Sequence, residues 1–156
     1  MRKLNKYIIL FFLITSVYAV DKTGTTAAKF LSIGVGSKAS GMGGAFTSIA
    51  NDATAMYWNP AGLSFNNTKE VYFNHANWIA DISFDYFGFT IPMNGKSTIG
   101  FNITSVTMDE MEVTRYGNED TGETFKAADY AIGSTYALNL TDRFSIGLNS
   151  KYIQQS

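Results

Sequence analysis

The chain of 156 residues contains no cysteine, a single histidine and only two prolines. Without cysteine it can form no disulfide scaffold, thiolate nucleophile or cysteine-based zinc site. One histidine leaves no cluster for a transition metal and no evident general base for a catalytic triad. We therefore expect a protein that is not an enzyme, with no catalytic residue, no metal site and no cofactor.

Charge is scarce as well. Only 16% of the residues are charged, and 12 Lys and Arg are balanced by 13 Asp and Glu. This balance leaves no basic excess to neutralise phosphates, so nucleic acid is excluded as a partner. Apolar residues are abundant, since 46% of the residues are hydrophobic and 15% are aromatic. Such a composition excludes a disordered chain and fits one small domain or a part of a larger one.

The first residues have the pattern of an export signal. Arg2, Lys3 and Lys6 precede an uncharged run over 7–17, and Ala19 stands where a signal peptidase reads small residues. The run is too short to cross a bilayer, which needs roughly 18 to 20 residues in a helix. The sequence predicts a signal peptide at 1–19 and no membrane-spanning helix after it, so any later insertion would have to use a β-barrel.

A stretch rich in small residues runs from Gly34 to Gly62. Its glycines complete neither a P-loop nor the G-x-G-x-x-G pattern, which excludes a nucleotide site. Small residues allow tight packing and positive φ angles. The segment 20–69 is therefore either a capped helix and turn in a small core or a compact plug that fits a confined space.

Within this segment we expect one short helix over 53–58. Asn51 or Asp52 would cap its first turn, because Asn and Asp side chains accept hydrogen bonds from free backbone N–H groups. The helix must end near Asn59, because Pro60 disfavours a helical conformation in the residue before it. Gly62 would then supply the exit turn.

From residue 70 onward the sequence alternates with a period of two, most clearly over 97–106, 129–140 and 144–152. One face of these predicted strands is apolar and uncharged, whereas the other carries mainly Gly, Ala, Ser, Thr and Asn. A lipid-facing surface excludes charge, because Lys or Arg costs about 2 to 4 kcal/mol at mid-bilayer. The predicted lipid-facing residues are Ile99, Phe101, Ile103, Tyr130, Ile132, Tyr136, Leu138, Phe144, Ile146 and Leu148.

The core of a β-sandwich would exclude charge equally well. The composition of the opposite face of the strands distinguishes a lipid-facing barrel from a sandwich. A soluble sandwich usually carries Lys, Glu and Arg on its solvent face, whereas small polar residues suit a lumen that is wet or holds a plug. Tight turns at 92–96 and 141–143 alternate with a long acidic loop over 107–127, as in outer-membrane barrels. The tight turns would then face the periplasm.

Two earlier strands, at 71–77 and 82–91, alternate poorly. In the second, Phe84 and Tyr86 lie opposite Phe87, and Asp85 shares the face of Phe87. A bulge or a location near the rim of a barrel would reconcile this pattern.

The remaining candidates for chemistry have ordinary explanations. The loop over 107–127 gathers carboxylates around Arg115, but without the spacing of a calcium loop, so we expect a solvated loop. Asp81 and Asp85 could form an acid and base pair, but we expect both near a turn, in water. His75 has no companion at a recognisable spacing and reads as a strand-surface histidine.

Two segments resemble the N-terminal signature of the PorV/PorQ family of outer-membrane proteins, which are similar in fold to the FadL fatty acid transporters: Ser37-Lys38-Ala39-Ser40-Gly41-Met42-Gly43-Gly44-Ala45-Phe46 and Asn51-Asp52-Ala53-Thr54-Ala55-Met56-Tyr57-Trp58-Asn59-Pro60-Ala61-Gly62-Leu63. Further likeness at 78–82, 128–131 and 142–147 extends the resemblance over nearly all of the expected mature chain. It implies an N-terminal plug whose motif residues are Gly41, Gly43, Gly44, Asn51, Asp52, Trp58, Asn59, Pro60 and Gly62.

The resemblance also implies the fold class: an all-β protein, the N-terminal portion of a FadL-like transmembrane antiparallel β-barrel with a small helical, Gly-rich plug. Single-chain barrels have at least about 8 strands, and an open strand edge in lipid is costly. We therefore expect 70–156 to hold the first strands, about five, of a barrel that this chain leaves incomplete.

Function follows from the same resemblance as an expectation. PorV-type members take part in protein export by type IX secretion, which implies outer-membrane lipid, secreted cargo proteins and other secretion components as partners. FadL relatives imply the first alternative, a channel for the uptake of hydrophobic small molecules. The second alternative is a secreted, soluble β-sandwich that binds other molecules.

Overall fold

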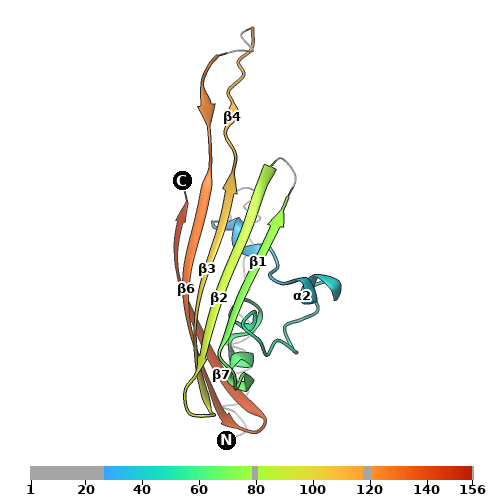
Figure 1. The fold of residues 1–156 in the computed structure, drawn as a ribbon, viewed down its shortest axis with the longest axis vertical. Helices are drawn as coiled ribbons and strands as arrows, with labels where there is room; N and C mark the ends of the chain where they lie inside the picture. Colours follow the sequence, from blue (N-terminus) through green and yellow to red (C-terminus); the bar gives the residue numbers. More distant parts are fainter. Residues whose placement is uncertain (1–26, 79–80, 118–120, 156) are drawn as a thin grey trace, which may run out of the picture.

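The computed structural model describes residues 27–78, 81–117 and 121–155. The predicted signal peptide at 1–19 lies outside the described residues and stays a prediction. The described chain begins with short helical turns and continues as long antiparallel strands (Figure 1). The helical turns are η1 (Lys29–Ser32), α2 (Ser37–Gly41), α3 (Ala55–Trp58) and η2 (Pro60–Phe65).

One antiparallel sheet of five strands forms the body of the molecule, in the order β1-β2-β3-β6-β7. Its strands are β1 (Glu70–Asn77), β2 (Ile82–Pro92), β3 (Ser97–Met108), β6 (Ala128–Thr141) and β7 (Phe144–Gln155). All the strands predicted from the sequence are present. The period of two identifies them because side chains two residues apart share one face of a strand. The sheet is open, and the predicted all-β, antiparallel fold class is confirmed.

The irregular pattern of β2 arises because large apolar side chains stand on both of its faces. Its pairing with β1 and with β3 is continuous, so there is no bulge. Phe84 and Tyr86 are buried against the N-terminal segment, where they cluster with Val35. Phe87, on the other face, is exposed. Asp85 is the fourth residue of β2, in the half of the strand next to the arm.

The connections between strands are short at one end of the sheet and long at the other. β2 ends at Pro92 and β3 begins at Ser97, while β6 and β7 are joined through a two-residue turn at 142–143. At the opposite end, two further strands, β4 (Met111–Glu112) and β5 (Thr124–Phe125), pair with each other. The predicted loop over 107–127 is thus an arm built as a hairpin, which extends beyond the sheet (Figure 1).

The N-terminal segment lies along one face of the sheet (Figure 1). It starts at the arm end, where the Ala28 N–H donates to the Gln155 side chain over 3.2 Å. Its η2 helix packs on β6 and β7 toward the tight-turn end, and β1 starts from there. Among the described residues, no helix has both the length and the apolar character needed to cross a membrane.

Two details of this segment differ from the sequence prediction. The helix α3 starts at Ala55, with Thr54 as its N-cap residue and no side-chain cap, so neither Asn51 nor Asp52 occupies the cap position. The helix does end at Asn59, whose φ of −158° is extended, as the following proline requires. Gly62 lies buried inside η2 and does not form an exit turn.

Candidate functional site

The predicted lipid-facing side chains all belong to the sheet face that carries no helix. All of them are exposed except Ile99 and Leu138, which are half-buried. Leu148 retains 71% of its accessible surface. In the residues that the structure describes, no second sheet packs on this face. Contiguous apolar surface of this kind marks contact with a membrane or a partner.

Strand register assembles these residues, except Tyr130, into a continuous band that Phe87, Leu140 and Tyr152 extend, and we call it the apolar band. Tyr130 lies just beyond it, in the register row of Asp85 and Gln154. One row crosses the sheet through Phe87, Ile103, Ile132 and Tyr152, and another through Ile99, Tyr136 and Leu148. Along β6 the band runs from Ile132 to Leu140, which is about 27 Å at a rise of about 3.4 Å per residue. A barrel strand tilted by about 40° turns this into about 21 Å of height, near the roughly 25 Å apolar zone of outer-membrane barrels.

A polar row ends the apolar band toward the arm. The His75 Nδ1 lies 2.7 Å from an oxygen of Asp85, directly across the β1–β2 pair, and its Nε2 lies 2.9 Å from the Asn77 side chain. Both residues of the His75–Asp85 pair are exposed at their side chains. His75 lies on the surface of a strand, as predicted, and its partner Asp85 comes from cross-strand register, which no spacing in the sequence reveals.

The other face of the sheet is covered by the N-terminal segment. Thr90, Thr98, Asn102, Thr104 and Thr135 are buried there, as are Ala131 and Ala137. The small polar face predicted from the sequence is therefore covered by this segment, and its role as the plug of a lumen stays a prediction. From here on, the plug means the described part of this segment, residues 27–69.

Glycines in the sheet provide the seat for the plug. Gly88 lies on β2, Gly100 on β3 and Gly147 on β7. A Cβ on Gly100 would lie 2.3 Å from the sulfur of Met56, and one on Gly147 would lie 2.2 Å from the backbone nitrogen of Ala61. The plug occupies the volume that side chains at these positions would need. We call Gly88, Gly100 and Gly147 the wall glycines.

Hydrogen bonds fix the plug internally and to the sheet. The Trp58 Nε1 donates to the carbonyl of Val35 over 2.8 Å, and the Asn59 amide donates to the carbonyl of Thr47 over 3.0 Å. These bonds tie α3 to the Gly-rich stretch before it. From the sheet, the Asn149 amide donates to the carbonyl of Met56 over 2.6 Å.

Two carboxylates organise the chain that leads into α3. The Asp52 carboxylate accepts the backbone N–H of Thr54 over 2.9 Å and also its hydroxyl. The Glu70 carboxylate, at the start of β1, accepts the backbone N–H of Ala53 over 2.8 Å. Ala53 is buried, so its N–H depends on Glu70.

Replacing Glu70 with alanine should loosen the plug, because it leaves the buried N–H of Ala53 without an acceptor. The expected loss is about 1 to 3 kcal/mol in the free energy of unfolding. Urea unfolding followed by tryptophan fluorescence measures it, since Trp58 lies in the plug. Glu70→Gln keeps an acceptor and should lose less, while Lys69→Ala at the exposed neighbouring position should be neutral. Equal stability of Glu70→Ala and wild type would refute this role.

The plug glycines serve different purposes. Gly43 and Gly44 have φ angles of 61° and 81°, and the Gly44 N–H closes a turn by donating to the carbonyl of Ala39 over 2.9 Å. Gly62 allows close approach, since its Cβ would collide with the backbone carbonyl of Ala50. Nothing in the structure explains why residue 41 should be a glycine. Pro60 is at the first turn of η2, where its missing N–H costs nothing.

Lys151 is the one basic side chain that β7 directs to the plug side, and it meets an aromatic ring there. Its Nζ lies 5.6 Å from the ring centroid of Tyr57. Burial raises the pKa of the Tyr57 hydroxyl above its ordinary value of 10.0, so the phenol stays neutral near pH 7. The contact is therefore a cation–π interaction with a neutral ring.

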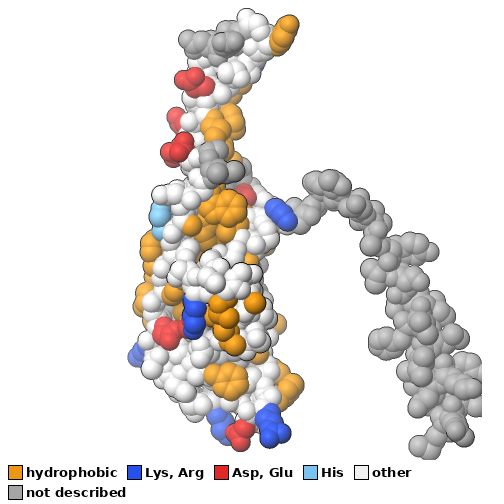
Figure 2. All heavy atoms as spheres, turned by 90° about the vertical axis from the view of Figure 1, so that its right-hand side faces the viewer, with side chains coloured by type: hydrophobic (Ala, Val, Ile, Leu, Met, Phe, Trp, Pro, Cys, Tyr) orange, Lys and Arg blue, Asp and Glu red, His pale blue; other side chains and the backbone are white. Residues whose placement is uncertain are grey.

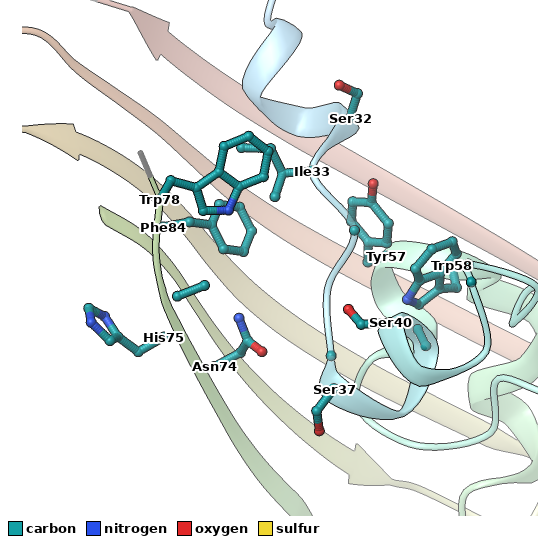
Figure 3. Close-up of a pocket in the computed structure, with 16 residues that line it drawn as sticks. Ser32, Ile33, Ser37, Ser40, Tyr57, Trp58, Asn74, His75, Trp78 and Phe84 are labelled. Atoms are coloured by element: carbon teal, nitrogen blue, oxygen red, sulfur yellow. The ribbon is translucent and has the colours of Figure 1, made fainter. Parts of the chain in front are cut away.

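An aromatic pocket of about 750 Å³ opens between the Gly-rich part of the plug and the upper parts of β1 and β2 (Figure 3). Its rings come from Tyr57, Trp58, Trp78 and Phe84. Asn74 and Ser40 point toward the space, whereas the His75 ring lies on the other side of β1 (Figure 3). The lining includes no lysine, arginine or carboxylate.

The acidic arm offers no metal site among the residues that the structure describes, where no group of three or more His, Asp or Glu side chains converges. Arg115 instead pairs with Glu123 over 2.6 Å. Glu119 and Asp120, which completed the acidic loop in the sequence, lie outside the described residues. Figure 2 shows acidic side chains along the arm, and basic and acidic ones together at the opposite end of the molecule.

Taken together, these features define an inside-out β protein: its exposed sheet face is apolar, and its small polar face is filled by its own N-terminal segment. The sequence model of a family described as type IX secretion system protein PorV matches residues 17–156. The chain therefore belongs to the PorV family, which is linked to type IX secretion at the outer membrane. No curated protein gives a match. No solved structure gives one either.

Proposed function

We propose that this protein is an outer-membrane β-barrel component of type IX secretion, that it takes part in protein export there, and that it catalyses no reaction itself. The observation that carries the proposal is the apolar band, an exposed and uncharged sheet face in a member of a secretion family. The predicted signal peptide at 1–19 supplies the route across the inner membrane.

The proposed orientation follows from the two ends of the sheet. Outer-membrane barrels have short periplasmic turns and longer extracellular loops. The turns at 92–96 and 141–143 would then lie in the periplasm, and the arm of β4 and β5 outside the cell. The polar row around His75 and Asp85 would lie at the outer boundary of the apolar zone, where charged groups reach water.

The plug argues against passage of cargo between it and these strands. It is seated on the wall glycines with contacts shorter than any side chain would permit. A plugged barrel is better suited to receive exported proteins, or to hold other secretion components, than to conduct a folded chain. Secreted cargo proteins and those components are the proposed partners, along with outer-membrane lipid.

A gene deletion distinguishes the export role from the first alternative, a FadL-like channel for hydrophobic small molecules. Deleting the gene should remove secreted cargo from the cell surface and leave it in the periplasm, and the wild-type gene should restore it. Surface biotinylation and immunoblotting of fractions measure this. Unchanged surface cargo together with impaired uptake of hydrophobic compounds would contradict the export role and favour the channel. A membrane protein of unrelated function, followed in parallel, controls for general envelope damage.

A further inference from the structure

The aromatic pocket carries neutral polar groups among its rings. The Asn74 amide and the Ser40 hydroxyl point toward its space (Figure 3), and Tyr57 adds a second hydroxyl to the lining. In the part of the chain that the structure describes, none of these three side chains makes a hydrogen bond. The pocket therefore offers donors and acceptors that a ligand can satisfy.

The rings supply flat apolar surface beside these groups. Tyr57 and Trp58 come from α3 and pack edge to face, with ring centroids 5.0 Å apart. Trp78, directly after β1, stays 50% exposed, whereas Phe84 is buried. Both tryptophans of the chain line this one pocket. A half-exposed indole at a pocket is a large surface on which a ligand can pack.

The lining determines which ligand chemistry fits. A fatty acid or another ion would bring its charge into a pocket that no lysine, arginine or carboxylate lines. A purely apolar molecule would cover Asn74, Ser40 and Tyr57 without replacing their hydrogen bonds to water, which is unfavourable. The fitting ligand is neutral, carries several hydroxyls and has a flat face of C–H groups. A sugar ring has all three properties.

We propose that the aromatic pocket binds a neutral saccharide. The C–H groups on one face of a sugar ring pack on the Trp78 indole, whose π electrons present partial negative charge to them. The Asn74 amide both donates to and accepts from sugar hydroxyls, as do the hydroxyls of Ser40 and Tyr57. The pocket lies toward the arm, so the saccharide reaches it from outside the cell. That direction of access rests on the proposed orientation, whereas the binding itself does not.

Two sources present such sugars outside the cell, free oligosaccharides and the sugar chains of lipopolysaccharide, and the test includes both. The first probes are fluorescently labelled neutral oligosaccharides of hexoses, deoxyhexoses and N-acetylhexosamines, with oligosaccharides of uronic acids as charged counterparts. The second are vesicles of lipopolysaccharide from the same cells, with vesicles of its lipid A as the blank. The purified full chain is kept in a detergent without a sugar head group, which would compete.

Saturable binding of a neutral probe is expected, measured by fluorescence anisotropy for the free sugars and by flotation for the vesicles. Binding of a free oligosaccharide identifies the first source. Binding of lipopolysaccharide alone, without binding of lipid A, identifies the second. Trp78→Ala should weaken the binding by about tenfold or more, Trp78→Phe should weaken it less because a ring face remains, and Asn74→Ala should weaken it several-fold.

The matched control is Phe73→Ala, which removes an aromatic ring that is 65% exposed on the opposite face of β1 and should leave binding unchanged. Circular dichroism and heat-dependent gel mobility establish that each variant is folded. Binding of neither source, or unchanged binding by a folded Trp78→Ala protein, would overturn the site. Uronic acid probes or lipid A that bind as tightly as the neutral sugars would overturn the assigned chemistry. No measurement here depends on cargo export in cells, so this proposal and the proposed function fail separately.

Discussion

An arginine in place of Leu148 is expected to abolish accumulation of the protein in the outer membrane. Leu148 lies in the middle of the apolar band on β7 and is 71% exposed, so the substitution meets no packing obstacle in the sheet. In water, such an exposed change would be nearly neutral. At the middle of a bilayer, arginine costs about 2 to 4 kcal/mol, enough to lower insertion by a factor of about 30 or more.

The same strand and face supply the matched control. Gln154 is exposed on β7, six residues further along, in the polar row paired with Tyr130. Gln154→Arg should leave the amount of protein in the outer membrane unchanged. Immunoblots of outer-membrane fractions compare the two variants at equal expression. Normal accumulation of Leu148→Arg would mean that this face does not contact lipid.

Valine at Gly147 is expected to unseat the plug. Its Cβ would lie 2.2 Å from the nitrogen of Ala61 and 2.3 Å from the carbonyl carbon of Pro60, and backbone atoms cannot move aside as a flexible side chain can. Overpacking of this kind typically costs 1 to 3 kcal/mol, and a clash with backbone lies at the upper end, at about 3 kcal/mol. Limited proteolysis should then cut within 34–62 at least tenfold faster than in the wild type.

Alanine substitutions at two other glycines should increase proteolysis less than Gly147→Val does. At Gly88 an added Cβ would meet the terminal methyl of Met56 at 2.9 Å, so Gly88→Ala should raise proteolysis only slightly. At Gly41 nothing lies within 4 Å, so Gly41→Ala should behave as the wild type. Equal protection of all three variants would show that the wall glycines do not seat the plug.

The strands of the sheet were predictable because their period of two survives in the sequence, and the register then follows from the tight turns. The outcome is clearest for β6 and β7, where every predicted lipid-facing residue lies on the face away from the plug. Strand β2 was ambiguous because it carries large apolar side chains on both faces, Phe84 buried against the plug and Phe87 exposed on the opposite face. The strands β4 and β5 are only two residues long, too short to show any period.

The interior of the site was less predictable, since it depends on contacts between distant parts of the chain. Gly100 and Gly147 look like ordinary small residues until Met56 and Ala61 are placed against them. Gly62 looked like a turn because turns are its commonest use, whereas here it serves close packing on Ala50. The approach of Arg143 to the Asn59 region requires the β6–β7 hairpin to fold over the plug, which no local pattern indicates.

Contact between the apolar band and acyl chains can be measured directly, because the chain has no native cysteine and single cysteines can be introduced for labelling. Cysteines placed singly at Leu148 and Gln154 can each carry a nitroxide spin label in protein reconstituted into lipid vesicles. Power-saturation EPR then compares collisions with oxygen, which dissolves in the bilayer, and with a water-soluble nickel chelate. The label at 148 should collide with oxygen but not with nickel, while the label at 154 should collide with nickel more often. Free access of nickel to the label at 148 would contradict it.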